Sequence, residues 1–172
     1  SLSDRQSHAS EDVVLSLAEM ATEDYRLHID PITLQVTAGE VIGLAGMEGS
    51  GQELFLRTCA GLKRPVGGRL SVSDFDLTGK PYRSFLERQV AFLPASRLEE
   101  GLVPGMHLTE HFILAEEQKG FFLDLENGVK LAKRRISDFN IRGTPFSMVE
   151  SLSGGNQQRT LLALLRTPLL LL

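Results

Sequence analysis

The sequence predicts an α/β domain in which a buried strand, a glycine-rich loop and a helix follow one another. Three observations lead to this prediction. Two segments near the N-terminus alternate apolar and polar residues, which is the pattern of half-buried strands. A short apolar run at residues 40–45 ends in a cluster of glycines and is followed by apolar residues at helical spacing. Between residues 108 and 139 the apolar positions recur at helical spacing, separated by charged clusters.

The size and composition are those of one packed domain. A chain of 172 residues corresponds to one domain or a large part of one, at roughly 100–200 residues per domain. Hydrophobic residues make up 42% and charged residues 23%, which excludes an intrinsically disordered chain. The net charge of -4 lacks the basic surplus that attracts nucleic acid, so we expect no nucleic-acid partner. The single cysteine cannot form an internal disulfide, which is typical of the reducing cytoplasm.

The first part of the chain is expected to consist mainly of sheet. Alternating residues predict two strands near one edge of the fold, at residues 13–17 and 32–36. The apolar run at 40–45 predicts a buried strand that leads into the glycine loop, and the apolar pattern at 54–62 predicts the helix that follows.

Glycine and proline mark two more expected strands in the middle of the chain. Gly67 and Gly68 form a turn signal before an expected exposed strand at residues 69–73. Pro94 ends an expected buried strand at 90–93. These segments add further sheet to the fold.

The second part is expected to be helical. A further helix is expected from about Gln157 to Arg166, and the apolar run 169–172 predicts a buried strand in which the chain stops. We therefore expect a fragment of a single domain. Its expected parts are a tail at residues 1–10, a β flank and loop-bearing core at 11–105, a helical subdomain at 106–150, and a helix with the start of a strand at 151–172.

The glycine loop at residues 46–51 has the context of a phosphate-binding loop (P-loop), because it follows an expected strand and precedes a helix. In such a loop, backbone N–H groups and the helix N-terminus hold phosphate. A working G-x-x-x-x-G-K-[ST] loop also needs a lysine and a hydroxyl, and Gln52 and Glu53 occupy those positions here. The alternative is a glycine turn that serves only tight packing of strand and helix. The candidate nucleotide contacts in this segment are Gly46, Gly49, Ser50, Gly51, Gln52 and Glu53.

Electrostatics predicts that this loop binds nucleotide weakly. A helix dipole favours an anion by about 0.3–2 kcal/mol. A carboxylate about 5 Å from a phosphate charge costs about 3 kcal/mol at an effective dielectric constant of ~20. Glu53, with Glu48 close by, is therefore expected to cancel the attraction of the loop. No second acidic residue is evident that would share a metal ion with Glu53, so we expect no metal site of the chain's own.

A second glycine segment, Leu-Ser-Gly-Gly-Asn-Gln-Gln at residues 152–158, is the more specific signal. Ser153 is placed to cap a helix, and Gly154 and Gly155 allow the backbone to approach a phosphate from the helix N-terminus. With Asn156, these residues complete the candidate nucleotide contacts. The segment resembles the signature motif of ABC-type ATPases, and its Asn-Gln-Gln continuation is similar to the ATP-binding subunits of ribose-type and other simple-sugar importers.

The resemblance extends from about Val13 to the end of the chain and is to the second of two tandem nucleotide-binding halves, in which the loop lysine is typically lost. Besides the signature, it includes residues 39–46, 92–94, Arg97, 100–102 and 139–142. One departure is Ala95-Ser96, where the family often has Glu-Asp and other ABC domains have a metal-contacting glutamine. The site of this chain is therefore expected to be more degraded than usual.

The resemblance implies an ABC-type nucleotide-binding domain of the P-loop NTPase fold. This fold has a mixed sheet core, an antiparallel β flank and a helical subdomain, and here it would be truncated before the end of the Walker B strand. The Walker B acids would follow Leu172, so no catalytic residue is expected and the chain alone should not hydrolyse ATP. Tyr25 would correspond to the aromatic residue that stacks on adenine, or would lie on the sheet edge.

The resemblance also implies partners. In the family two domains pair head to tail, so that the signature of one faces the phosphate loop of the other. ATP and Mg²⁺ would therefore bind in a composite site with a partner half. Transmembrane permease subunits of a sugar importer would hold the protein on the inner face of the cell membrane.

Three weaker signals have structural interpretations. His107-Leu-Thr-Glu-His111 fits the H-x-x-E-H zinc pattern, but Glu110 at the capping-box position predicts a helix start instead. Cys59 is expected to be a small buried thiol. The basic run 133–135 is expected to be a solvated helix face, with an acidic partner surface as the alternative.

The sequence leaves two other functions open. A noncatalytic interaction module would keep the fold and bind protein but not nucleotide, and ATP-dependent pairing with a lysine-bearing half would distinguish it from the first interpretation. A chromosome or repair ABC ATPase is disfavoured by the acidic charge balance and by the lack of a coiled-coil heptad run.

Overall fold

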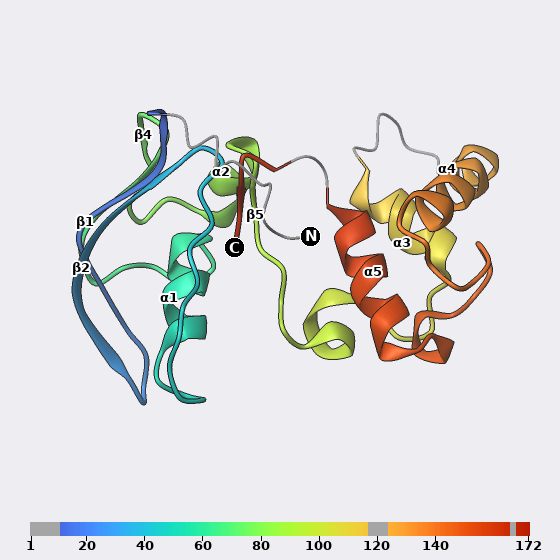
Figure 1. Ribbon diagram of the computed structural model, residues 1–172, viewed down its shortest axis with the longest axis horizontal. Coiled ribbons are helices and arrows are strands. Elements are labelled where there is room, and N and C mark those ends of the chain that lie inside the picture. The colour runs from blue at the N-terminus through green and yellow to red at the C-terminus, as the bar shows by residue number, and fades with distance from the viewer. Residues whose placement is uncertain (1–10, 117–123, 166–167) are drawn as a thin grey trace, which may run out of the picture. The chain divides into compact units, whose positions relative to one another are not determined.

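The computed structural model describes residues 11–116, 124–165 and 168–172, which form two compact units (Figure 1). Among these residues, the first unit runs up to Phe92 and includes Pro168–Leu172, and the second begins at Leu93. The sequence predicts the boundary between the β and helical parts later in the chain, between residues 105 and 106, and groups the last helix with the final strand. The difference arises because Leu102 and Leu161 are buried in the core of the second unit.

The first unit contains a four-stranded antiparallel sheet in the order β2-β1-β3-β4 (Figure 1). Its strands are β1 (Val13–Glu23), β2 (His28–Thr37), β3 (Gly67–Val72) and β4 (Phe75–Asp76). Leu15 on β1 lies opposite Val36 on one side and Val72 on the other. The two strands predicted from alternation are confirmed. The third was expected to be exposed and is instead an inner strand, on which Leu70 and Val72 are buried.

Two helices and a short parallel strand pair complete the first unit. These elements are α1 (Gln52–Cys59), α2 (Tyr82–Glu87), β5 (Val90–Ala91) and β6 (Leu170–Leu171). Phe55 and Cys59 of α1 and Phe85 of α2 pack into one core with the buried residues of β1 and β3. Burial raises the pKa of the Cys59 thiol to about 12. Cys59 is thus the buried thiol that the sequence predicts.

The predicted strand at residues 40–45 does not form. Residues 41–47 lie outside regular secondary structure, and residues 41–50 are all exposed, Val41 to 94%. A strand needs a neighbour that supplies hydrogen bonds to its backbone. None of the described strands pairs with this segment. An apolar pattern favours burial, but it does not supply the neighbouring strand on which a buried strand depends.

The second unit is built from helices around its own core. These elements are η2 (Arg97–Gly101), α3 (Leu108–Ala115), α4 (Leu125–Asp138), η3 (Val149–Ser151) and α5 (Gly154–Leu164). Phe112 of α3, Ala132 of α4 and Leu161 of α5 are buried together. The helical character predicted between residues 108 and 139 is confirmed for the described residues. The last helix begins at Gly154 rather than Gln157 because Ser153 is its N-cap, and its predicted end at Arg166 lies outside the described residues.

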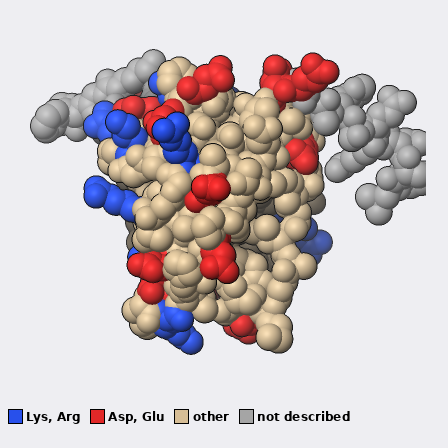
Figure 2. Space-filling view, turned by 90° about the vertical axis from the view of Figure 1, so that its left-hand side faces the viewer, with Lys and Arg blue, Asp and Glu red and all other residues tan. Residues whose placement is uncertain are grey.

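Charged residues are spread over the surface. The face shown in Figure 2 carries acidic and basic side chains among uncharged residues, without a continuous basic area. On α4, Lys133 and Arg134 are exposed, as expected for a solvated helix face, whereas Arg135 pairs with Glu116 at 3.2 Å. In the part of the chain that the structure describes, no helix has both the length and the apolar character needed to cross a membrane.

Candidate functional site

The glycine loop before α1 adopts the backbone conformation that its glycines permit. Gly49 and Gly51 have φ angles of 78° and 109°, in the left-handed region that favours glycine. Gly51 is the N-cap of α1, and its carbonyl oxygen accepts the N–H of Phe55 at 2.9 Å. The first N–H groups of α1 therefore point toward the loop, as they do in phosphate-binding loops.

Side chains fill the space inside this loop. The Ser50 hydroxyl oxygen lies 2.7 Å from the Met47 carbonyl oxygen and 2.9 Å from Oε1 of Gln52. The Gln52 amide turns back over Gly46, where its Nε2 occupies the volume that the Cβ of a larger residue would take. A neutral amide thus stands where a phosphate-binding loop has the lysine ammonium.

Glu53 is directed along α1 toward Arg57. Its Oε1 accepts hydrogen bonds from Nε and Nη2 of Arg57 at 2.8 and 2.7 Å. The Arg57 guanidinium also lies over the Phe92 ring, 5.4 Å from the ring centroid. The repulsion expected from the sequence is therefore weaker, because a cation in contact with the carboxylate offsets its charge. The i,i+4 spacing of the two residues is the sequence signal for this pair.

Tyr25 lies in the turn between β1 and β2 and is 91% exposed. Oδ1 of Asp24 holds this turn by accepting the N–H groups of Arg26 and Leu27 at 2.7 and 2.8 Å, which lowers the pKa of Asp24. Together with residues 62–66, which follow α1, the turn lines an open groove of about 510 Å³. Tyr25 is thus in a turn rather than on the sheet edge, and its stacking on adenine stays a prediction.

The signature segment forms the start of α5. Ser153 is the N-cap, and its carbonyl oxygen accepts the N–H groups of Asn156 and Gln157 at 2.8 and 2.9 Å. Ser153, Gly154 and Gly155 are exposed. Within the described residues, the N–H groups of the two glycines donate to no protein acceptor. The segment thus presents free donors at a helix N-terminus, an arrangement that suits an anionic oxygen.

Asn156, the fourth predicted contact of the signature, differs from its neighbours because it is only 6% exposed. Its Oδ1 lies 3.0 Å from the backbone nitrogen of Arg142 and 3.2 Å from Nη1 of Arg159. Its Nδ2 lies 3.0 Å from Oγ of Ser153. Both ends of the amide are therefore bonded to protein groups, and a contact of Asn156 with nucleotide stays a prediction.

Arg97 lies beside the signature, a placement that the sequence does not reveal. A Cβ on Gly154 would lie 3.4 Å from Nη2 of Arg97. Arg97 is exposed, and within the described chain its side chain has no hydrogen bond or ion pair. η2 reaches this position because Gly101 has no side chain, and a Cβ there would collide with Leu161 of α5. The guanidinium thus adds positive charge next to the N-terminus of α5.

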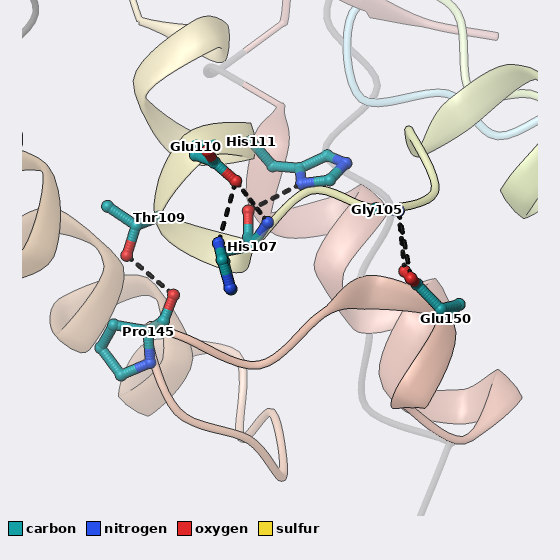
Figure 3. A network of polar contacts seen from close by, with 7 residues as sticks. All are labelled: Gly105, His107, Thr109, Glu110, His111, Pro145 and Glu150. Carbon is teal, nitrogen blue, oxygen red and sulfur yellow. Dashed lines mark hydrogen bonds and ion pairs between the residues drawn. The ribbon is translucent and has the colours of Figure 1, made fainter.

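The segment His107–His111 forms the start of α3 (Figure 3). The Glu110 carboxylate accepts the N–H of His107 at 2.6 Å, as in a capping box, and this bond lowers the pKa of Glu110. The Val103 N–H donates to Nε2 of His111 at 2.9 Å, so Nδ1 carries the hydrogen and donates to the His107 carbonyl oxygen at 2.9 Å. The described residues hold no group of three or more metal-ligating side chains. The predicted helix start is confirmed, and His111 has no ring nitrogen free for zinc.

Two further hydrogen bonds in this region fix the segment that leads into the signature (Figure 3). Both carboxylate oxygens of Glu150, on η3, lie 3.1 Å from the backbone nitrogen of Gly105, which donates to them. The Thr109 hydroxyl donates to the Pro145 carbonyl oxygen at 2.8 Å. α3 and the loop before it therefore hold the chain on the N-terminal side of Ser153.

The predicted contacts fall into two groups. Residues 46–53 and Tyr25 belong to the first unit, and residues 153–156 belong to the second. Each group contains the N-terminus of a helix. Only the second presents an exposed hydroxyl beside free backbone N–H groups, because Ser50 in the first is bonded within its own loop.

Known proteins match most of this chain, over a range that includes the glycine loop and the signature segment. Residues 29–172 match the family model described as ABC transporter. The nucleoside import ATP-binding protein NupA of Lactococcus lactis subsp. cremoris is 31% identical over 160 residues, which cover 88% of this chain and 32% of that protein. The ribose import ATP-binding protein RbsA of Chromobacterium violaceum is 33% identical over 157 residues, which cover 88% of this chain and 30% of that protein. The chain thus spans about a third of the length of these relatives.

Solved structures share the fold. The structure of an ATP-binding subunit of an ABC transporter has a TM-score of 0.67 at 22% identity, covering 88% of this chain and 61% of that one. MJ1267, an ATP-binding cassette of an ABC transporter, has a TM-score of 0.73 at 17% identity, covering 88% of this chain and 64% of that one. The predicted ABC-type α/β fold is confirmed. The chain belongs to the ABC transporter family.

Proposed function

We propose that this chain is the ATP-binding, energy-coupling component of an importer for a sugar or a related small solute. It contributes its signature segment to an ATP site shared with a partner half. The observation that carries the proposal is the contrast between two helix N-termini. The start of α5 presents the exposed Ser153 hydroxyl and two free glycine N–H groups, whereas the loop before α1 is filled by the Gln52 amide.

The chain's own loop does not fit ATP with Mg²⁺. Gln52 is neutral where a lysine would reach the β- and γ-phosphates. Glu53 has no hydroxyl for Mg²⁺, and its carboxylate is paired with Arg57. The signature fits a phosphate better, because N–H groups and a hydroxyl are the donors that hold anionic oxygens at helix N-termini. In this proposal the partner half holds ATP and Mg²⁺, and the signature of this chain meets the γ-phosphate.

The cargo and the remaining partners are proposed from the relatives. Their names specify import of nucleoside, ribose and arabinose, all of which are sugars or contain one. Transmembrane permease subunits carry the solute. This chain binds the permease subunits from the cytoplasmic face of the membrane through its helical unit. ATP bound between this chain and the partner half closes the two halves on each other, and this closure drives transport.

A second candidate function is a noncatalytic module that binds protein and no nucleotide. The observation that favours it is the filled glycine loop, in which Ser50 and Gln52 satisfy each other. The two candidates differ in one measurable property. A signature-contributing half pairs with a lysine-bearing half only when ATP is present, whereas an interaction module pairs equally well without ATP.

Substitutions in the two segments test the proposed division of roles in the assembled importer. Ser153→Arg is expected to reduce ATP turnover to background, because the larger side chain fills the space through which a triphosphate approaches α5. Gln52→Ala is expected to leave turnover nearly unchanged, because that position already lacks the lysine. Steady-state ATPase rates of the two variants decide the matter. Equal losses in both variants, or full activity in Ser153→Arg, would contradict the proposal.

A further inference from the structure

The Ser153 hydroxyl, the exposed group at the N-cap of α5, is held by a buried side chain. Asn156 is 6% exposed, and its Nδ2 lies 3.0 Å from Oγ of Ser153. We propose that Asn156 is a positioning residue that makes the Ser153 O–H point outward, as a hydrogen-bond donor to an oxygen of the phosphate held by the partner half. This inference rests on the function proposed above and adds to it the residue that orients the serine.

The direction of the Asn156–Ser153 hydrogen bond follows from the other end of the amide. That end lies 3.0 Å from the backbone nitrogen of Arg142 and 3.2 Å from Nη1 of Arg159. A backbone N–H and a guanidinium can only donate, so the atom that faces them must be the carbonyl oxygen. The opposite atom is then the NH₂ group, which donates to Oγ of Ser153.

This bond determines which hydrogen-bonding groups of the Ser153 hydroxyl remain available to a ligand. A serine hydroxyl has one hydrogen and two lone pairs. Asn156 uses a lone pair, and within the described chain the hydrogen has no acceptor. Oγ is also released from the usual capping role, because the Asn156 N–H bonds to the Ser153 carbonyl oxygen instead. The exposed O–H is therefore available to a group that only accepts, such as a phosphate oxygen.

Neighbouring hydrogen bonds hold Asn156 itself in place. The buried Thr160 hydroxyl donates to the Asn156 carbonyl oxygen at 2.9 Å. Nε2 of the buried Gln157 donates to the Val149 carbonyl oxygen at 3.1 Å and so fixes the same turn of α5 to η3. Arg142 and Arg159 fix the Oδ1 end of the Asn156 amide, and the bonds from Thr160 and Gln157 fix the backbone of this turn, so the NH₂ group is directed at Oγ of Ser153.

Two substitutions of Asn156 separate orientation from packing. Asn156→Asp keeps the shape and the acceptor for Arg142 and Arg159, but it presents an acceptor to Ser153, so the O–H turns inward. Asn156→Ala removes every side-chain bond and leaves the hydroxyl free to rotate. We expect ATP turnover of the assembled importer to fall about ten- to a hundredfold in Asn156→Asp, and less in Asn156→Ala. A purely structural role gives the opposite order, because alanine removes more bonds, and that order would overturn the inference.

Asn156→Asp also introduces a negative charge, and the effect of this charge is measured separately by making the same substitution in the Ser153→Ala variant. There, Asn156→Asp is expected to cause no further fall in kcat, because no hydroxyl remains to be misdirected. A further loss would assign the effect to charge or to damage and would overturn the inference. KM for ATP is expected to stay unchanged, since the partner half holds the nucleotide. A rise in KM with an unchanged kcat would also overturn the inference.

Ser153→Ala and Ser153→Arg together distinguish failure of this inference from failure of the proposed function. If Ser153→Ala keeps the parent's turnover and Ser153→Arg abolishes it, the signature acts through its glycine N–H groups and only this inference fails. If both variants keep the parent's turnover, the signature does not take part in turnover and the proposed function fails. If Ser153→Ala loses turnover while Asn156→Asp keeps it, the composite site stands and only the orienting role of Asn156 fails.

Discussion

Two buried threonines show how the role of a residue depends on its hydrogen-bond partners. Thr22 on β1 and Thr58 on α1 are both fully buried, and their hydroxyl oxygens lie 2.7 Å apart. The Thr58 hydroxyl donates to the Leu54 carbonyl oxygen at 2.8 Å, so the Thr22 hydroxyl must be the donor between the two threonines. Removal of one threonine hydroxyl therefore leaves the other buried hydroxyl in a different state: without an acceptor in one case, and still hydrogen-bonded in the other.

Removing either hydroxyl is expected to destabilise the fold unequally. Thr58→Val leaves the Thr22 O–H buried without an acceptor, which costs about 1–3 kcal/mol. Thr22→Val leaves Thr58 bonded to Leu54, so we expect a loss of only about 0.5–1.5 kcal/mol. Urea unfolding of the two variants and of the double variant measures these differences. A larger loss for Thr22→Val would contradict the donor direction assigned here.

Single-residue roles were predictable from the sequence only where the partner lies nearby in the chain. The pairing of Glu53 with Arg57 follows from their i,i+4 spacing. The burial of Asn156 does not, because the Arg142 backbone that it accepts from is 14 positions away. The signature residues can therefore be found from the sequence, whereas the burial of Asn156 among them cannot.

Apolar periodicity was sufficient to predict strands β1 and β2 and the segments that contain helices α1, α3 and α4. A helix satisfies its backbone hydrogen bonds within its own segment, so no neighbour has to be predicted for it. The segment 40–45 has an equally clear apolar pattern but forms no strand, because a strand depends on a neighbour. The same dependence explains β3, whose inner place in the sheet is set by β1 and β4.

The start of α3 is expected to make a pH-dependent contribution to stability. The His107 N–H donates to the Glu110 carboxylate and lowers its pKa below the ordinary value of 4.5. A carboxyl with a lower pKa in the folded state stabilises the fold above its unfolded pKa, and this contribution is lost as the pH falls through the folded pKa. Glu110→Gln is therefore expected to lower the melting temperature at pH 7, by a difference that shrinks as the pH falls below about 4.5.

A carboxylate on the neighbouring helix provides the control for Glu110. Glu126 on α4 forms an exposed i,i+4 pair with Lys130 at 2.9 Å. Exposed pairs of this kind contribute little to stability, so Glu126→Gln is expected to change the melting temperature less at pH 7. A deficit in Glu110→Gln that stays constant from pH 7 to well below pH 4.5 would show that the lost bond does not depend on the carboxylate charge.

At the scale of the whole molecule, long-range packing decides which segments belong together. The sequence and its family resemblance identified the fold and both glycine segments, and they placed the helices in order along the chain. They did not predict that η2 joins the helical unit, because this depends on the close approach of Gly101 to Leu161, 60 positions later. A division between units is a property of side-chain packing, which periodicity along the chain does not report.

Each of the two units contains the N-terminus of a helix. Restoring the lysine and the hydroxyl in the glycine loop before α1 tests whether the missing positive charge is the reason for weak nucleotide binding there. Gln52→Lys with Glu53→Ser places an ammonium against the loop and a hydroxyl at the metal position, while Gly49 and Gly51 keep the loop backbone. A hydrogen bond to a charged group contributes about 1.5–3 kcal/mol. We therefore expect the affinity of this loop for ATP with Mg²⁺ to rise about ten- to a hundredfold.

The matched control for this restoration is Gln52→Met with Glu53→Ser, which has a side chain of similar length and no charge. It removes the same Gln52 amide from the loop and the same carboxylate from Arg57, so any gain due to opening the loop appears in both variants. Titration calorimetry of the full-length protein measures the number of nucleotides bound and their affinity. A second bound nucleotide in the lysine variant alone would support the proposal that the loop backbone is intact and lacks only the positive charge. Equal binding by both variants would show that the gain comes from losing the hydrogen bond between Gln52 and Ser50 or the Glu53 carboxylate, and not from the added charge.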